Sequence, residues 1–167
     1  MDGNGRWASK NNLKKKEGHK AGINSCINLI KSINKLDVQI NEISFYVFST
    51  ENWKRSLSEI SNLFSLIEEF YKEFEMNAQK YNLKIRHYGS RKKLSKKILH
   101  IIDDVTKKTK NNSSTAINLV FNYGGRDEIV SSIKKIKSGK INKVNITKNL
   151  YTSTSKDPDL IIRTGGE

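Results

Sequence analysis

The first eight residues of the chain, MDGNGRWA, gather groups that together could bind a phosphorylated ligand. Asp2 supplies a carboxylate, a hard oxygen ligand of the kind that Mg²⁺ takes alongside phosphate oxygens. Gly3 and Gly5 predict a flexible turn that lets backbone amides approach an anion, and Arg6 offers paired hydrogen bonds to a phosphate. A solvated N-terminal turn would explain the same residues, so this interpretation depends on the rest of the chain.

A basic motif follows a few residues later. Three consecutive lysines, with Lys15 in the middle, precede Gly18 and His19. Because a helix is expected to begin near this point, His19 and a lysine would lie close to a helix N-terminus, where exposed amides attract phosphate. A surface histidine beside a solvated run of charge is an equally good interpretation of this motif alone.

The segment from Ser49 to Arg55 carries the densest set of polar groups. Trp53 offers an apolar wall and Arg55 a second phosphate ligand, so the segment suits a ligand with a charged head and a hydrocarbon tail. The alternative is a capped turn in which Trp53 fills the core. We favour a binding role because four polar side chains converge directly before a helix: Ser49, Thr50, Glu51 and Asn52.

Two further glycine motifs lie at predicted strand ends. Gly124 and Gly125, in the segment 122–126, allow the chain to turn into the next helix, so that motif can be structural. Arg163 opens the last motif, residues 163–167, and is one of only six arginines among 31 basic residues. An arginine that persists in such a lysine-rich chain is a candidate for a bidentate contact.

Composition limits the classes of protein to be considered. A chain of 167 residues suits a single domain, residues 1–167, with a core of its own. The net charge of +14 favours an anionic partner, but most of it comes from lysine runs that are typical of solvated surface, so it argues only weakly for nucleic acid. The single cysteine, Cys26, excludes an internal disulfide and lies on the apolar face of a predicted helix. No apolar run reaches transmembrane length.

Hydrophobic periodicity predicts the elements that must position these motifs. The alternation of helix and strand predicts an α/β fold, a central parallel sheet flanked by helices on both faces. Ligands of such sheets bind beyond the carboxyl ends of the strands, where three of the motifs fall. Ser56 and Glu59 match a capping box before the longest helix. The predicted helices are 20–36, 60–74, 94–105 and 127–136, the strands are 43–48, 83–88, 116–121 and 160–162, and the surface connections are 107–115 and 138–147.

Five segments make the chain similar to the cis-prenyltransferases, the family of undecaprenyl diphosphate synthase and dehydrodolichyl diphosphate synthase. They are MDGNGRWA (1–8), GHKAG (18–22), FSTENWKR (48–55), NYGGRDEI (122–129) and DPDLIIRTGGE (157–167). The resemblance implies a parallel-sheet α/β fold that forms a homodimer, or a heteromer with a family subunit. It also implies a Mg²⁺-dependent enzyme that adds isopentenyl diphosphate to an allylic diphosphate such as farnesyl diphosphate, each new double bond being cis.

The resemblance further implies a role for each matching residue. Asp2 would bind Mg²⁺ and assist departure of the allylic diphosphate, and Asn52 would help to remove the proton. The allylic diphosphate would be held by Gly3, Asn4, Gly5 and Arg6, with Lys15 and His19 nearby; Arg55 and Arg163 would lie around isopentenyl diphosphate; Ser49, Thr50 and Glu51 would line the site; and Trp7 and Trp53 would border the groove. The helix 63–74 would flank the product tunnel.

The chain departs from the family pattern at several points. Lys15 stands where the family usually has Arg, which keeps the charge but loses the bidentate fork. Ser56 replaces a common Pro, and Ser90 replaces an acidic residue. The chain also begins within the first motif and ends before an Arg-x-Ser segment and a further acidic metal ligand. The resemblance therefore predicts an incomplete copy of the family with an open sheet edge.

Three functions follow from these observations. The first is cis-prenyl chain elongation to a long-chain polyprenyl diphosphate. The second is a non-catalytic family subunit that binds diphosphates or partners without turnover, against which the retention of Asp2, Asn52 and Arg163 argues. The third, a basic nucleic-acid-binding domain, ranks last because the arginines gather in the diphosphate motifs. The expected location is the cytoplasm, with peripheral contact at a membrane (the endoplasmic reticulum in a eukaryote) because the product is insoluble.

Overall fold

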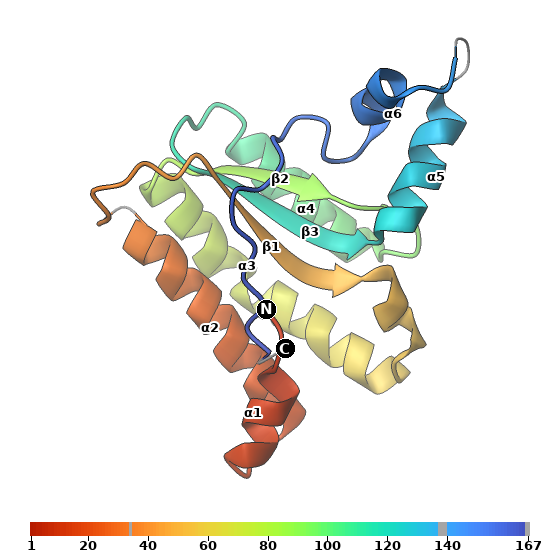
Figure 1. The fold of residues 1–167 in the computed structure, drawn as a ribbon. Helices are drawn as coiled ribbons and strands as arrows, with labels where there is room; N and C mark the ends of the chain where they lie inside the picture. The colour runs from red at the N-terminus through yellow and green to blue at the C-terminus, as the bar shows by residue number, and fades with distance from the viewer. Residues whose placement is uncertain (34, 137–139, 166–167) are drawn as a thin grey trace.

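The fold is built from a small parallel sheet and the helices that connect its strands (Figure 1). A computed structural model describes residues 1–33, 35–136 and 140–165 of the chain. In chain order its elements are α1 (Asn4–Lys10), α2 (Lys15–Ile33), β1 (Glu42–Ser49), the 3-10 helix η1 (Thr50–Lys54), α3 (Leu57–Lys80), β2 (Lys84–Tyr88), α4 (Lys96–Lys108), β3 (Ala116–Tyr123), α5 (Gly125–Lys135) and α6 (Lys143–Asn149).

The sheet confirms the predicted parallel arrangement. The strand order is β1-β3-β2, and β3 pairs in parallel with both neighbours. The strands start in line, since Glu42 and Lys84 both lie opposite Ala116. The central place of β3 is reflected in its burial: six of its eight residues are buried, as expected of a strand covered on both faces. The carboxyl ends of all three strands therefore lie at one edge of the sheet.

The main core lies between one face of the sheet and the helices α2, α3 and α4. Phe45, Ile85 and Ile117, one from each strand, pack there against Ile30 of α2 and Val105 of α4. A second, aromatic cluster fills the space nearer the carboxyl ends of the strands, where it contains Phe48, Phe121, Leu94, Ile98 and Ile102 with Trp53, Leu63, Phe64, Ile67 and Leu99 packed against it. The apolar stripe of α3 thus contributes to both clusters.

The opposite face of the sheet is covered differently. In the part of the chain that the structure describes, the coil that follows α6 crosses this face and then runs down to the N-terminus (Figure 1). Thr154 and Ser155 in that coil hydrogen-bond to the Tyr88 hydroxyl at 2.8 and 2.7 Å. The expectation of helices on both faces is therefore met on one face by α2, α3 and α4, whereas coil covers the other.

Three local predictions are wrong. Residues 160–162, predicted as a strand, are coil with side chains 73–80% exposed, because within the described residues they have no strand beside them to complete a ladder. The N-terminal turn is instead the helix α1, since Gly3, at φ 86°, forms its left-handed N-cap. Part of the connection 138–147 is the helix α6, whose Asn142 side chain accepts a hydrogen bond from the Asn145 N–H at 2.9 Å; residues 138 and 139 of that connection lie outside the described residues.

The other predicted elements are confirmed with shifted ends. The helix expected at 20–36 begins five residues earlier as α2, and the one expected at 60–74 extends over Leu57–Lys80. Ser56 caps α3 as predicted, its side chain accepting from the Glu59 N–H, but the Glu59 carboxylate, expected to complete a capping box, pairs with Arg55 and Lys15 instead. None of the helices in the described ranges combines the length and apolar character needed to cross a membrane.

Candidate functional site

The N-terminal motif and the last motif meet, although they lie at opposite ends of the chain. Arg163 donates from Nη2 and Nε to Asp2 Oδ2 at 3.1 and 3.3 Å. The Thr164 hydroxyl accepts from the Asp2 N–H and donates to the Asp2 carbonyl at 2.9 and 3.0 Å. Arg6 Nη2 donates to the Gly165 carbonyl at 2.8 Å. The structure therefore brings together Asp2, Arg6 and Arg163, three of the residues proposed from sequence; Gly166 and Glu167 of the last motif lie outside the described residues.

The Asp2 carboxyl is held in its charged form. Its pKa lies below the ordinary value, first because the Gly3 N–H donates to Oδ1 at 2.7 Å and second because Arg163 donates to Oδ2. A Gly165 side chain would collide with this group, since a Cβ there would lie 2.7 Å from Arg6 Nη2 and 2.9 Å from Asp2 Oδ2. The glycine thus lets the backbone approach the carboxylate closely.

Two glycines of the GHKAG segment seat α1 on α2. A Cβ on Gly18 would lie 2.2 Å from the Asn4 carbonyl oxygen, and one on Gly22 would lie 2.5 Å from the Asn4 Nδ2 atom. Both glycines are buried in α2. Because α1 follows directly from Asp2, this close helix contact fixes where the N-terminal motif lies. Gly5, also proposed from sequence, is helical in α1, and a Cβ there would meet nothing within 4 Å.

The end of β1 is shaped by a capping box, which is the capped turn that the sequence left open as the alternative to a binding role. The Ser49 hydroxyl accepts from the Glu51 N–H at 3.1 Å, and the Asn52 Oδ1 atom accepts from the Ser49 N–H at 2.8 Å. The Asn52 side chain therefore caps the N-terminus of its own helix, η1. The neighbouring Glu51 is exposed. The signal was present in the sequence, because Ser followed three residues later by Asn offers the same reciprocal pair of hydrogen bonds.

The ends of β1 and β3 are joined through Trp53. Its indole Nε1–H donates to Asn122 Oδ1 at 2.8 Å, and its ring packs edge-on to Phe48 at 5.2 Å between centroids. Gly124 lies so close to Thr50 that a Cβ would be 2.4 Å from its hydroxyl. Trp53 thus contributes to the core, and its place at a substrate groove stays a prediction. Trp7, by contrast, is 47% exposed on α1.

Arg55 and Lys15 both lie beside the carboxylate of Glu59, a residue that the sequence had suggested only for a helix cap. Glu59 Oε1 lies 3.1 Å from Arg55 Nη1, and Oε2 lies 3.7 Å from Lys15 Nζ. The Nδ1 atom of His19 is buried and, among the described residues, has no hydrogen-bond partner. Burial lowers the pKa of the His19 ring; the charge of Glu59 opposes this shift and the two cations reinforce it. Lys15, His19 and Arg55 are therefore electrostatic neighbours, as an anion site needs.

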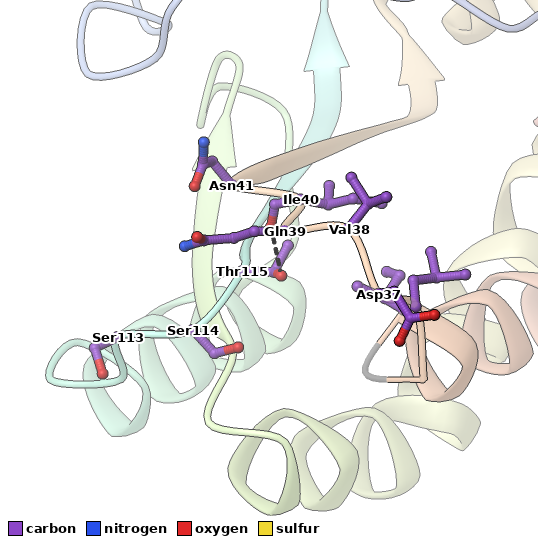
Figure 2. A pocket seen from close by; sticks show the side chains of 10 residues that line it. Asp37, Val38, Gln39, Ile40, Asn41, Ser113, Ser114 and Thr115 are labelled. Atoms are coloured by element: carbon purple, nitrogen blue, oxygen red, sulfur yellow. Dashed lines mark hydrogen bonds between the residues drawn. The ribbon is translucent and has the colours of Figure 1, made fainter.

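Two cavities among the described residues lie elsewhere. One, of about 360 Å³, lies at the amino end of the sheet and is lined by Val38, Ile40 and Thr115 among others (Figure 2). The other, of about 530 Å³, lies beside β2 and is lined by His87, Arg91 and Tyr151 among others. None of the proposed site residues lines either one. We place the candidate site at the motif residues, because ligands of parallel sheets bind at the carboxyl ends of the strands.

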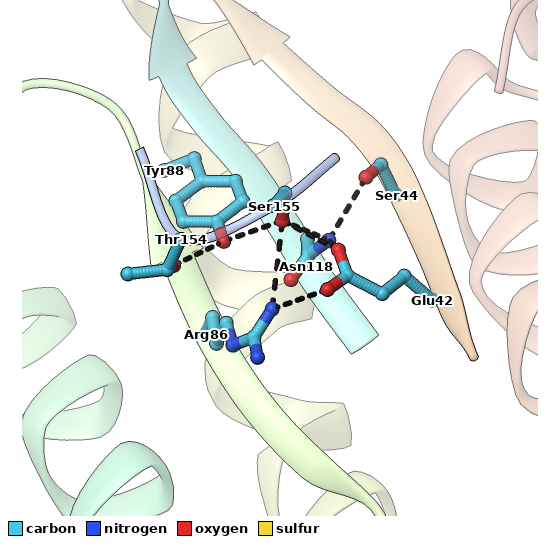
Figure 3. Close-up of polar contacts among 7 residues, drawn as sticks. All are labelled: Glu42, Ser44, Arg86, Tyr88, Asn118, Thr154 and Ser155. Atoms are coloured by element: carbon cyan, nitrogen blue, oxygen red, sulfur yellow. Dashed lines mark hydrogen bonds and ion pairs between the residues drawn. The ribbon is translucent and has the colours of Figure 1, made fainter. Parts of the chain in front are cut away.

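A polar network on the coil-covered face of the sheet anchors the chain that leads to Arg163 (Figure 3). The Ser155 hydroxyl donates to the Glu42 carboxylate at 2.5 Å, Arg86 donates to the same carboxylate at 2.8 Å, and Asn118 donates to it at 3.1 Å. Burial raises the pKa of Glu42, but these hydrogen bonds outweigh it and hold the pKa below its ordinary value. The coil is thereby fixed to all three strands eight residues before Arg163.

Fold and site together define a class of α/β protein in which a carboxylate held by two guanidinium groups accompanies a parallel sheet, with a further arginine just beyond the end of one strand. The profile of the Prenyltransf family, undecaprenyl diphosphate synthase, matches residues 1–167. The chain belongs to this family and is an enzyme of the prenyltransferase class. The resemblance seen in the sequence motifs is thereby confirmed.

Individual relatives agree with this assignment. An isoprenyl transferase of Treponema denticola is 42% identical over 171 residues, which cover all of this chain and 74% of the relative. One of Leptospira interrogans is 38% identical and is covered over 73% of its length. A solved structure of a probable undecaprenyl diphosphate synthase from Campylobacter jejuni aligns with a TM-score of 0.68 at 32% identity, covering 76% of this chain and 62% of that one.

A second solved structure supports the fold. Lavandulyl diphosphate synthase from Lavandula x intermedia, determined in complex with dimethylallyl diphosphate, aligns with a TM-score of 0.83 over 93% of this chain and 70% of that one. At 22% identity this likeness concerns the fold alone. The chain spans about three quarters of the length of the two curated relatives named above, so its own substrates are a separate question.

Proposed function

We propose that the chain catalyses cis-prenyl chain elongation, the sequential condensation of isopentenyl diphosphate onto an allylic diphosphate such as farnesyl diphosphate. The observation that carries the proposal is the meeting of Asp2, Arg6 and Arg163 from the two ends of the chain. A carboxylate flanked by two guanidinium groups suits a metal–diphosphate ligand: Asp2 would hold the metal ion, and Arg6 and Arg163 would bind phosphate oxygens. Family membership supports the same chemistry.

The residue roles follow from the chemistry of the condensation. The allylic C–O bond breaks and diphosphate leaves with the electron pair; the double bond of isopentenyl diphosphate forms the new C–C bond, and a proton is lost. Positive charge at Arg6 and Lys15 would stabilise the leaving diphosphate together with the backbone of residues 3–5. Arg55 and Arg163 would orient isopentenyl diphosphate.

The other groups would serve the proton and the hydrocarbon. Asn52 is proposed to lie near the proton that is lost, in a site lined by Ser49, Thr50 and Glu51. Trp7 and Trp53 would exclude water from the developing allylic cation, which water would otherwise trap. His19 supports this picture with an Nδ1 atom that is buried without a partner among the described residues. A buried polar atom of this kind is poised to bind a ligand oxygen.

Mg²⁺ is proposed as the cofactor, and Asp2 as its protein ligand. The lowered pKa of Asp2 fits this role, because a hard cation needs an ionised oxygen ligand. Within the residues described, no group of three or more His, Cys, Asp or Glu side chains forms a metal site, which fits an ion that takes most of its ligands from phosphates and water. When bound, Mg²⁺ would offset negative charge on the departing diphosphate.

The test is transfer of labelled isopentenyl diphosphate onto farnesyl diphosphate, with and without Mg²⁺, using wild-type protein and the variants Asp2→Ala and Arg163→Gln. We expect a cis-configured polyprenyl product that requires Mg²⁺ and falls by at least about 100-fold in each variant. Diphosphate binding without any product would instead support the non-catalytic subunit. Product formation by Asp2→Ala at the wild-type rate would refute the assignment of Asp2.

We further propose a homodimer, or a heteromer with a family subunit. Support comes from the consecutive apolar side chains of Leu160, Ile161 and Ile162, which are 73–80% exposed and would be stabilised by burial against a further surface. Sedimentation velocity at several concentrations tests this; a monomer throughout would contradict the homodimer. Peripheral membrane contact remains a prediction, tested by flotation with lipid vesicles.

A further inference from the structure

Glu59, in α3, lies between one cation from α2 and another from the short link between η1 and α3. Its carboxylate is 3.1 Å from Arg55, just before α3, and 3.7 Å from Lys15, in the first turn of α2. Its side chain is 22% exposed, whereas those of Arg55 and Lys15 are 43% and 68% exposed. The carboxylate is thus the more buried centre of a three-residue charge cluster.

Capping α3 does not require the Glu59 carboxylate. The cap is formed when the Ser56 hydroxyl accepts from the backbone N–H of Glu59 at 3.3 Å. Any residue except proline supplies that N–H. The carboxylate is instead directed to two side chains that, under the proposed function, bind diphosphate. Its position therefore has a reason beyond helix capping.

We propose that Glu59 is a positioning residue of the diphosphate site, whose carboxylate holds Lys15 and Arg55 together before the ligand binds and is displaced from them by the diphosphate. The inference rests on the proposed function, because that function assigns both cations to diphosphates. Each diphosphate carries more negative charge than one carboxylate and presents more acceptor oxygens, so the allylic diphosphate can displace Glu59 from Lys15 and isopentenyl diphosphate can displace it from Arg55. Glu59 would then keep the two cations close together but lower the affinity of the protein for diphosphate, because the ligand must displace the carboxylate.

The measurable consequence is that neutralising Glu59 strengthens the binding of anions. Each partly exposed ion pair is weak, so releasing both cations should raise the affinity for inorganic diphosphate by about threefold to tenfold. The gain should shrink at high salt, because added ions screen charges at this exposure. The gain in diphosphate affinity should also be smaller when Arg55 is itself neutralised, because one of the two released cations is then absent.

The chain offers a matched control on the same pair of helices. Glu69 of α3 pairs with Lys20 of α2 at 2.9 Å, so Glu69→Gln removes the same charge and another α2–α3 ion pair. Glu69 is ten residues further along α3, a distance of about 15 Å, beyond the screening length at moderate salt. Glutamine keeps the shape of both side chains and leaves the Ser56 cap intact.

The experiment is calorimetric titration of the full chain with inorganic diphosphate, without metal, at 50 and about 500 mM NaCl. We expect Glu59→Gln to bind about threefold to tenfold more tightly at low salt, with little gain at high salt, and Glu69→Gln to bind like wild type. In an Arg55→Gln background the gain from Glu59→Gln should be smaller, a coupling that a purely structural role would not produce. Glu59→Ala provides a second neutral variant, and thermal unfolding checks that each variant is folded.

Unchanged or weaker diphosphate binding by the folded Glu59→Gln and Glu59→Ala proteins would overturn the inference. So would an equal gain in Glu69→Gln, which would reflect net charge alone, or an absence of diphosphate binding in every protein. A failure of the proposed function has a different signature: wild type and Glu59→Gln would bind diphosphate as expected, yet no prenyl product would form.

Discussion

The substitution Gly18→Ala tests whether the contact between α1 and α2 positions the N-terminal motif. A Cβ at residue 18 would lie 2.2 Å from the Asn4 carbonyl oxygen and 2.9 Å from the Ala8 Cβ. These obstructing atoms belong to the backbone and to a side chain with no rotatable end, so the two helices must move apart by roughly 1 Å or more to restore van der Waals contact. Overpacking of this kind costs about 1–3 kcal/mol, while the better helix propensity of alanine returns up to about 1 kcal/mol. Because the closest approach is to a backbone atom, the cost lies in the upper part of that range, about 2–3 kcal/mol, so the expected net loss is about 1–2 kcal/mol of unfolding free energy.

Urea unfolding followed by far-UV circular dichroism measures this loss. With a denaturant dependence of about 2 kcal/mol per molar, the midpoint of Gly18→Ala should fall by about 0.5–1 M. The matched control is Gly5→Ala in α1, where a Cβ meets nothing within 4 Å. Its midpoint should stay the same or rise, because alanine favours the helix.

The outcome that refutes this reasoning is a Gly18→Ala midpoint equal to or above that of wild type while Gly5→Ala behaves as expected. The close approach of α1 to α2 would then not be what holds Asp2 and Arg6 in place. A loss in both variants would point to a general intolerance of the two helices rather than to the steric contact.

Three further predictions concern groups at other points in the fold. Trp53→Phe keeps the aromatic contact but leaves the buried Asn122 Oδ1 without the indole donor at 2.8 Å, so the unfolding free energy should fall by about 1–2 kcal/mol in urea denaturation, and an unchanged midpoint would contradict this. Burial raises the pKa of Cys26 to about 11, so the folded chain should react with iodoacetamide at pH 8 roughly 100-fold more slowly than the urea-unfolded chain, whereas equal rates would place the thiol at the surface. Burial opposes ionisation of Glu42, but hydrogen bonding, led by Ser155, lowers the pKa of this carboxyl overall. The stability that Glu42 contributes is therefore present above its unfolded-state pKa and is lost as the pH falls through its lower folded-state pKa. Glu42→Gln should therefore cost about 1–2 kcal/mol at pH 7 and less below about pH 4, and a cost independent of pH from 7 to 3 would contradict this.

Much of the architecture could be predicted from local sequence. The strands β1, β2 and β3 were expected from short runs rich in aromatic and branched residues, because such side chains pack well on the pleated surface of a sheet. The start of α3 was expected from Ser56, since the cap needs only a hydroxyl three residues before a free N–H. Motif spacing also indicated the family, which the comparison with known proteins confirms.

Other features depended on contacts that no local pattern encodes. Residues 160–162 have the composition of a buried strand, but a strand forms only where another strand offers its hydrogen-bonding groups. The role of Gly18 was not evident from the sequence. A side chain at this position is excluded only because the Asn4 backbone packs against it in the folded chain. Likewise, the sequence assigned Glu59 to a helix cap, and only the packing of α2 beside α3 brought its carboxylate to Lys15.

The sequence by itself therefore determined the chemical groups of this prenyltransferase and the order of its three strands and the helices α2, α3, α4 and α5, because residue type and hydrophobic period are local properties. The tertiary structure decided which groups meet. It joined Asp2 to Arg163 across 161 positions of the chain, placed Glu59 between two cations and buried His19 Nδ1 without a partner among the described residues. These are consequences of packing, which depends on the whole surface that each helix presents to its neighbours.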